Sequence, residues 1–110
     1  MFKRVTIVRK RPQLTADEFE RAWLGEHIEH ARCLPGLREY VIDFVTDGPP
    51  GAPDGIATVR FDTREACEAA FATPGLREDL LRTRAEFAEC ADVLFVDERV
   101  IAMDFPQERR

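Results

Sequence analysis

No stretch of this 110-residue sequence comes near the roughly 20 consecutive apolar residues that a membrane-spanning helix needs. Basic residues are also in the minority, with 16 Lys and Arg against 21 Asp and Glu. A nucleic-acid surface needs a basic patch that neutralises phosphates, so this balance argues against such a partner. The first residues lack the long apolar segment of a signal peptide. We therefore expect a cytoplasmic protein that binds neither membrane nor nucleic acid.

Cysteine is sparse as well. The three cysteines, Cys33, Cys67 and Cys90, are widely spaced and odd in number, which argues against a disulfide framework. We interpret them as free and mostly buried thiols; a nucleophilic pairing of Cys33 with His27 or His30 is a less favoured alternative. No phosphate-binding loop, nucleophile elbow or HExxH motif is present, so we expect no metal and no cofactor. Haem remains an alternative because it can bind without a linear motif.

The composition is that of one globular domain, with 45% hydrophobic and 34% charged residues spread over residues 1–110. The basic residues around the first apolar segment, Arg4 among them, are interpreted as solvated strand ends. Residues 103–110 read as a flexible tail. Runs of β-forming residues predict strands at 4–9, 37–45, 56–62 and 93–102. Capping and apolar-spacing signals predict helices over 15–33, 63–71 and 76–88.

The predicted order β-α-β-β-α-β is that of a ferredoxin-like α+β fold, an antiparallel sheet with its helices on one face. Thr15 and Glu18 form a capping box at the first helix, and Pro35-Gly36 ends it. The strands carry apolar residues on both faces, although helices cover only one of them. A second copy of the same sheet is the simplest cover for the other face, so we expect a homodimer.

Residues 8–27, VRKRPQLTADEFERAWLGEH, resemble the start of EthD-like domains, which belong to the dimeric α+β barrel superfamily. Trp23-x-x-x-His27 followed by Leu34-Pro35-Gly36-Leu37, with Tyr40 three residues on, carries the strongest part of the resemblance. The resemblance implies a dimeric barrel that binds a small molecule. It extends to isomerases, cyclases and dehydratases, to cofactor-free monooxygenases and haem proteins, and to members without assigned activity.

His27 is the main candidate for catalysis. Trp23 lies four residues before it, so both side chains share one helical face. Histidine titrates near neutrality and can move a proton on an enolisable or aromatic substrate. The alternative is a structural histidine at a helix end. His30, one turn further on, is interpreted as a surface residue.

Other candidates come from the aromatic and strand residues. Tyr40 is proposed to assist His27 by hydrogen-bonding a substrate carbonyl, and Trp23 and Phe19 to form an aromatic wall, although Phe19 also fits a plain core position. Thr58 and Arg60 share a strand face on which Arg60 is able to hold a carboxylate or enolate, with a salt bridge at the rim as the alternative. Asp43 is similarly either a base or the partner of an arginine.

These observations favour a small cofactor-independent enzyme. It would isomerise, cyclise or dehydrate a small hydrophobic, oxygenated or aromatic substrate by proton transfer, with His27 and Tyr40 as catalytic residues. Two alternatives stay open at this point. One is a non-catalytic binding or accessory protein of the same fold, and the other is a cofactor-free or haem-dependent monooxygenase.

Overall fold

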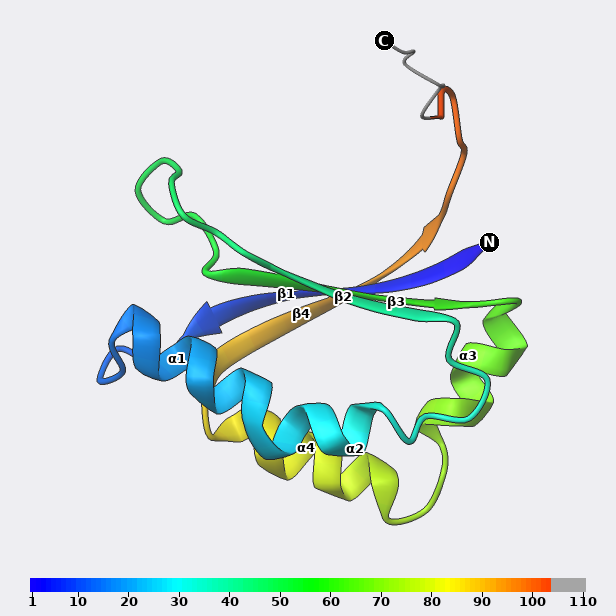
Figure 1. The fold of residues 1–110 in the computed structure, drawn as a ribbon, viewed down its shortest axis with the longest axis horizontal. Coiled ribbons are helices and arrows are strands. Elements are labelled where there is room, and N and C mark those ends of the chain that lie inside the picture. Colours follow the sequence, from blue (N-terminus) through cyan, green and yellow to red (C-terminus); the bar gives the residue numbers. More distant parts are fainter. Residues whose placement is uncertain (104–110) are drawn as a thin grey trace, which may run out of the picture.

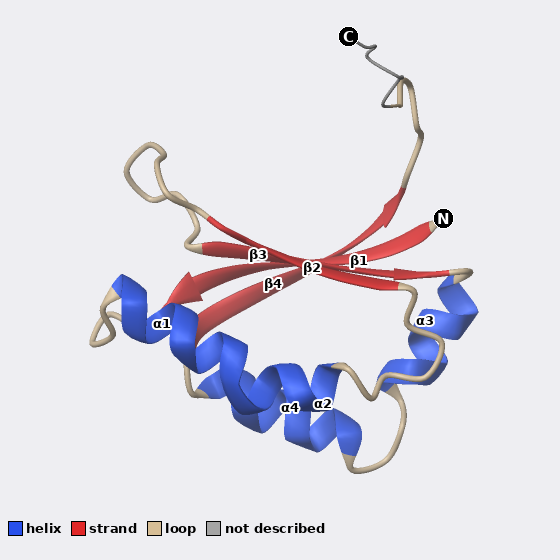
Figure 2. Ribbon diagram, in the orientation of Figure 1, coloured by secondary structure: helices blue, strands red, loops and turns tan. Residues whose placement is uncertain are grey.

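The computed structural model describes residues 1–103, so all but the first residue of the predicted tail at 103–110 lies outside the described residues. Four strands form one sheet and the helices pack beneath it (Figures 1 and 2). The strands are β1 (Phe2–Lys10), β2 (Glu39–Phe44), β3 (Gly55–Phe61) and β4 (Ala88–Asp97). The helices are α1 (Ala16–Ala22), α2 (Ile28–Ala31), α3 (Arg64–Phe71) and α4 (Leu76–Ala85).

The sheet has the order β2-β3-β1-β4, and every neighbouring pair of strands is antiparallel. All four helices lie on the same side of this sheet (Figure 2). The predicted α+β fold, with an antiparallel sheet and helices on one face, is therefore confirmed. The β2–β3 hairpin, expected from the Gly- and Pro-rich loop between its strands, is also present.

The first helix begins as the sequence predicts. The Thr15 hydroxyl accepts the backbone N–H of Glu18 at 3.1 Å, and the Glu18 carboxylate accepts the N–H of Thr15 at 2.8 Å. The helix is not continuous, however. A π-helical turn (Trp23–His27) with a non-helical backbone at Gly25 separates α1 from α2. This turn carries both Trp23 and His27.

The boundary between α4 and β4 differs from the prediction. The helix ends at Ala85 and the strand already begins at Ala88, whereas the sequence predicted a helix to residue 88 and a strand from residue 93. Residues 88–92 pair with the last residues of β1, with Lys10 opposite Ala88. Pairing with the free edge of β1 therefore makes residues 88–92 a strand, although their own composition does not favour one.

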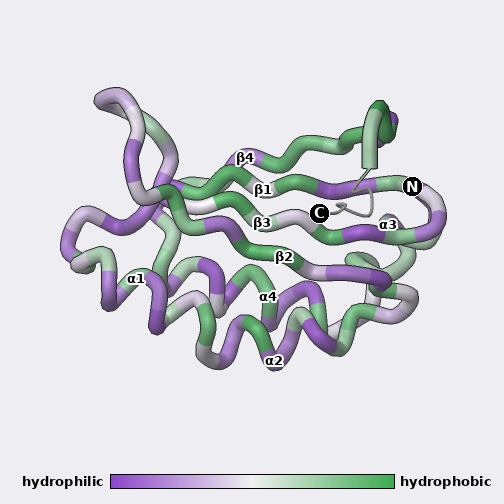
Figure 3. Tube along the Cα trace, turned by 45° about the horizontal axis from the view of Figure 1, so that its top comes forward, coloured by the Kyte–Doolittle hydropathy of each residue, from purple (hydrophilic) through white to green (hydrophobic). Residues whose placement is uncertain are grey.

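Strand alternation divides the sheet into two unlike faces. The helix-facing residues of β3, including Val59 and Phe61, are buried, while their neighbours Thr58 and Arg60 lie on the open face at intermediate exposure. Figure 3 shows how hydrophobic residues concentrate along the strands. On the open face this leaves apolar side chains in solvent, among them Leu94, which is 51% exposed.

Candidate functional site

A cavity of about 360 Å³ lies between the helix-covered face of the sheet and the helices. Its walls come from all four strands, from α2, α3 and α4, and from the π-helical turn. Most of its lining is apolar, as in small-molecule sites generally. The polar side chains that line it are Arg4, Thr6, His27, Tyr40, Cys67, Glu68, Arg77 and Arg84.

His27 is buried in the wall of this cavity, and its Nδ1 lies 2.7 Å from the hydroxyl of Thr83. The Thr83 hydroxyl donates its single proton to the carbonyl of Asp79 at 2.8 Å, one helical turn back. With its proton so engaged, the hydroxyl is left to accept a hydrogen bond from His27, which assigns the imidazole proton to Nδ1. Nε2 then carries the lone pair, and within residues 1–103 no protein group hydrogen-bonds to Nε2.

Burial sets the charge of this imidazole. Loss of hydration lowers the pKa of His27 to about 4, and the nearby charges of Arg84 and His30 act in the same direction. The ring is therefore neutral at physiological pH. A neutral imidazole with an unprotonated Nε2 is able to accept a proton, and its low pKa makes it a weaker base than an exposed histidine.

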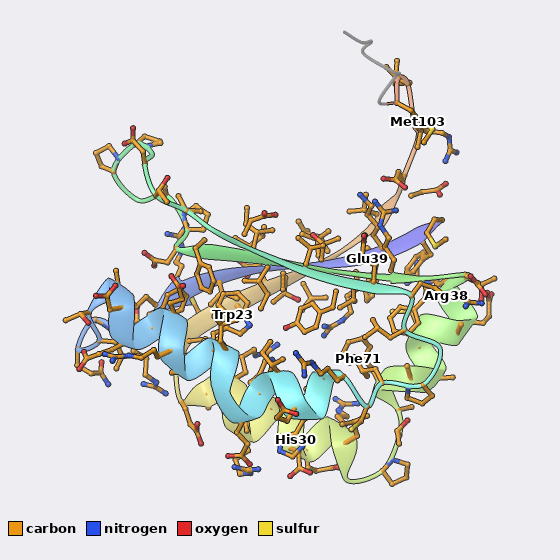
Figure 4. The ribbon with its side chains drawn as sticks, in the orientation of Figure 1. Trp23, His30, Arg38, Glu39, Phe71 and Met103 are labelled. Atoms are coloured by element: carbon orange, nitrogen blue, oxygen red, sulfur yellow. The ribbon has the colours of Figure 1, made fainter. Side chains whose placement is uncertain are left out.

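Trp23 and Tyr40 stand beside His27 in the cavity wall. The Trp23 indole N–H donates to the Tyr40 hydroxyl at 3.4 Å, so the phenolic proton remains available to a ligand oxygen. Burial raises the pKa of Tyr40, which keeps that proton in place. Trp23 stacks on Phe87 at 5.0 Å between ring centroids and lies between sheet and helices (Figure 4). The two residues can thus form an aromatic wall with one polar end.

Three predicted ligand-binding residues do not line this cavity. Phe19 is 3% exposed and packs edge-on against Trp23 in the core, the alternative that the sequence had left open. Thr58 and Arg60 lie on the open face of the sheet, because they alternate with the residues that face the helices. Arg60 binds the carboxylates of Glu39 and Glu98 there. These salt bridges fit the alternative interpretation of Arg60, and its predicted role in substrate binding has no support from this cavity.

The remaining polar candidates lie outside the cavity. His30 pairs with Glu26 and Asp79 on the outer side of the helices (Figure 4), and Asp43 is exposed on the open face. Within residues 1–103 no three His, Cys, Asp or Glu side chains form a group that could hold a metal ion. No helix in the described part of the chain is long and apolar enough to cross a membrane.

All three cysteines are free, as predicted, but only Cys67 is buried. Cys33 and Cys90 are exposed, so the expectation of mostly buried thiols was wrong. Burial raises the pKa of the Cys67 thiol, which therefore stays protonated although it lines the cavity. The structure thus gives no thiolate nucleophile in the cavity wall.

Sequence reasoning missed the cationic part of the site. Arg4 was interpreted as a solvated strand end, yet it lies on the helix-facing side of β1 and lines the cavity with its guanidinium carbon 3.9 Å from the centroid of the Phe71 ring. Arg84 joins it from α4 and Arg77 from the start of that helix. Strand alternation does hold a signal for Arg4, because it shares a face with Thr6 and the buried Val8. The helical period holds a similar signal for α4, because Arg77 and Arg84 are seven residues apart and share a face with the apolar Leu80 and Leu81.

The fold and the cavity define a small α+β protein with a ligand-sized site beneath its sheet. The model of the EthD domain matches residues 11–90, which is most of the chain, and the protein belongs to the EthD domain family. The family resemblance expected from Trp23, His27 and the following Leu-Pro-Gly-Leu segment is thereby confirmed. No curated protein sequence matches this chain significantly.

Several solved structures are similar to this chain. An EthD family protein from Bacillus halodurans has a TM-score of 0.73 and 18% identity, over 90% of this chain and 100% of that one. A dimeric ferredoxin-like protein of unknown function from Thermobifida fusca has a TM-score of 0.67 and 16% identity, over 86% and 88%. SnoaB, a cofactor-independent oxygenase from Streptomyces nogalater, has a TM-score of 0.66 and 16% identity, over 94% and 97%. At such identities the likeness establishes the fold and leaves the activity to the site.

Proposed function

We propose that this protein is a cofactor-independent enzyme that moves a proton on a small hydrophobic, oxygenated substrate held in the cavity. The observation that carries the proposal is the state of His27: neutral, buried, fixed through Nδ1 by Thr83 and unpaired at Nε2 within the described residues. Isomerisation, cyclisation and dehydration can each begin with proton removal by such a base. The apolar lining around it suits an aromatic or polycyclic substrate.

In the proposed reaction, Nε2 of His27 takes a proton from a substrate carbon next to a carbonyl. The Tyr40 hydroxyl donates a hydrogen bond to that carbonyl oxygen, on which negative charge develops. Trp23 holds the ring system and fixes the Tyr40 oxygen through its indole N–H. The Nδ1–Thr83 hydrogen bond orients the imidazole and supports the imidazolium that forms. The proton then returns to another atom of the same substrate, which completes an isomerisation.

Hydrogen–deuterium exchange on a model ketone tests this proposal without knowledge of the natural substrate. The probe is 2-tetralone in D₂O, and ¹H NMR follows the loss of its C1 proton signal. We expect the wild-type protein to accelerate the exchange and His27→Gln to lose about 10²-fold or more of that acceleration. His30→Gln is the matched control and should behave as wild type. A rate for His27→Gln within threefold of wild type would reject the assignment.

A cofactor-free monooxygenase is the second candidate, and the similarity to SnoaB favours it. Proton removal by His27 would serve it too, since it generates the carbanion that reacts with dioxygen. Oxygen uptake measured with an electrode in the presence of a substrate separates the two reactions. A Soret band in the purified protein would point to haem instead, and tight binding without conversion of any ligand would favour a non-catalytic binding protein.

The homodimer belongs to the same proposal. The open face carries exposed Val41, Leu94 and Val96 beside half-buried Val5 and Ile56, and a second copy related by a two-fold axis would cover them. The dimeric state of the Thermobifida fusca neighbour supports this arrangement. Each cavity lies on the helix-covered side of its sheet, away from this interface, so the dimer would hold two separate sites. We expect the protein in the cytoplasm.

A further inference from the structure

The arginines of the cavity differ from most other arginines of residues 1–103 in having no acidic partner. Arg38, Arg60, Arg64, Arg82 and Arg99 each form a salt bridge with a carboxylate. Within residues 1–103, the guanidinium groups of the cavity arginines, Arg4, Arg77 and Arg84, form neither a salt bridge nor a hydrogen bond. Arg4 only contacts the face of the Phe71 ring, and this contact leaves its charge uncompensated.

The cavity is therefore cationic. Glu68 is its one acidic lining residue, and its carboxylate already accepts a hydrogen bond from Arg64 at 3.1 Å, on the exposed side of α3. Arg4 and Arg84 are half-buried, while Arg77 is exposed to solvent. A guanidinium keeps its charge in a protein even when burial lowers its pKa, as it does for Arg4. Such unpaired charges are costly to bury unless a ligand supplies the opposite charge.

These cations line the same cavity as the base. The charge of Arg84 lowers the pKa of both Arg4 and His27. The whole chain has a net charge of −5, so the positive charge of this cavity is opposite in sign to that of the protein as a whole. A phosphate-rich macromolecule does not fit, because the cavity lies beneath the sheet and most of its walls are apolar.

We infer that the ligand of this cavity is an organic acid: an aromatic or polycyclic molecule whose carboxylate binds Arg4 and Arg84, with Arg77 attracting it at the entrance. Arginine is suited to this task because its planar donors match the two oxygens of a carboxylate. The apolar walls and Trp23 bind the ring system, and the carboxylate lies at the α3–α4 end of the cavity. This inference names the substrate class for the proposed enzyme and rests on that function only in placing substrate and His27 in the same cavity.

Indole-3-acetate and its neutral analogue indole-3-acetamide test the inference as a matched pair. Isothermal titration calorimetry at low ionic strength measures the affinity of each for the wild-type protein. The indole N–H signal of Trp23, the single tryptophan of the chain, reports in ¹⁵N-labelled protein whether binding occurs in this cavity. We expect the carboxylate to bind at least tenfold more tightly than the amide and added salt to reduce the difference.

Substitutions then assign the selectivity to residues. Arg4→Gln and Arg84→Gln should each bring the two affinities to within about threefold. The carboxylate loses a charged partner in either variant, whereas the neutral amide loses little. Arg38→Gln, in an exposed pair with Asp62, is the matched control and should keep the wild-type preference. Equal affinities of wild type for the two ligands would overturn the inference. So would a tenfold preference that survives in the folded Arg4→Gln/Arg84→Gln double variant. The wild-type comparison holds even if a variant fails to fold.

The outcome is separable from that of the proposed function. His27→Gln should keep the preference for indole-3-acetate while it loses proton exchange on 2-tetralone. An acid-selective cavity without exchange activity would support the ligand class and reject the enzyme. Exchange activity without selectivity for the carboxylate would support the enzyme and reject the ligand class.

Discussion

The hydroxyl of Thr83 lies 2.7 Å from Nδ1 of His27, and both side chains are buried. The two residues are 56 positions apart, so this hydrogen bond joins α4 to the π-helical turn. Because the same hydroxyl donates to the Asp79 carbonyl, the hydrogen bond determines which ring nitrogen holds the proton. Thr83 thereby acts as a positioning residue for His27.

Thr83→Val removes the acceptor of the Nδ1 proton and keeps the shape of the side chain. The imidazole should shift to the tautomer protonated on Nε2, because an unsatisfied buried N–H costs about 1–3 kcal/mol. That tautomer cannot accept a proton at Nε2, so the exchange rate on 2-tetralone should fall at least tenfold. The ¹⁵N shifts of the His27 ring report the tautomer directly, and Thr83→Ser should restore both tautomer and rate. An unchanged tautomer in Thr83→Val would contradict the assignment.

The low pKa of His27 predicts how stability depends on pH. Burial lowers this pKa from 6.5 to about 4 in the folded protein, so between these values the unfolded chain binds more protons than the folded one. The free energy of unfolding should therefore fall as the pH drops from about 6.5 to 4, by up to about 3 kcal/mol from this group. His27→Gln lacks that contribution. Urea unfolding at several pH values should give a shallower dependence for the variant, and equal slopes would show that His27 is not buried as a neutral ring.

Gly55→Ala tests the close contact between β3 and the aromatic wall. A Cβ at position 55 would lie 2.5 Å from Cζ3 of Trp23, so the indole would have to move. We expect a loss of about 1–3 kcal/mol in the free energy of unfolding, as for other overpacked cores. Trp23→Phe removes the clashing atom, and in that background the glycine substitution should cost at least 1 kcal/mol less, on the order of contact couplings elsewhere. Purely additive effects of the two substitutions would show that they do not touch.

The two-sheet dimer is tested at Leu94, which lies on the open face and is 51% exposed. Leu94→Glu places a charge where the second sheet would pack, and it should convert the dimer to a monomer because a buried unpaired charge is costly. Leu24→Glu is the control, since Leu24 is similarly exposed, at 49%, but lies on the π-helical turn. Light scattering at micromolar concentration distinguishes the 12.6 kDa monomer from its dimer. A monomeric wild-type protein would reject the interface.

Much of the fold was predictable because its signals are local. The capping residues Thr15 and Thr63 begin their helices as expected, since each side chain accepts an N–H three residues ahead. The turn residues after Phe44 indicated the hairpin. Where a segment lacks a preference of its own, as from Ala88 onward, pairing with a neighbouring strand decided its conformation, and local reasoning placed the boundary too late.

The candidate site likewise combines features that the sequence predicts with features that only the tertiary structure sets. The sequence by itself determined that Trp23 and His27 share a helical face and that Arg60 and Thr58 share a strand face, because the period of a helix or strand is a property of the backbone. Only the tertiary structure decided which face the helices cover. That choice placed Arg60 outside and Arg4 inside the cavity. It also brought Thr83 to His27, since a contact between residues 56 positions apart depends on how the helices pack and leaves no periodic signal in the chain.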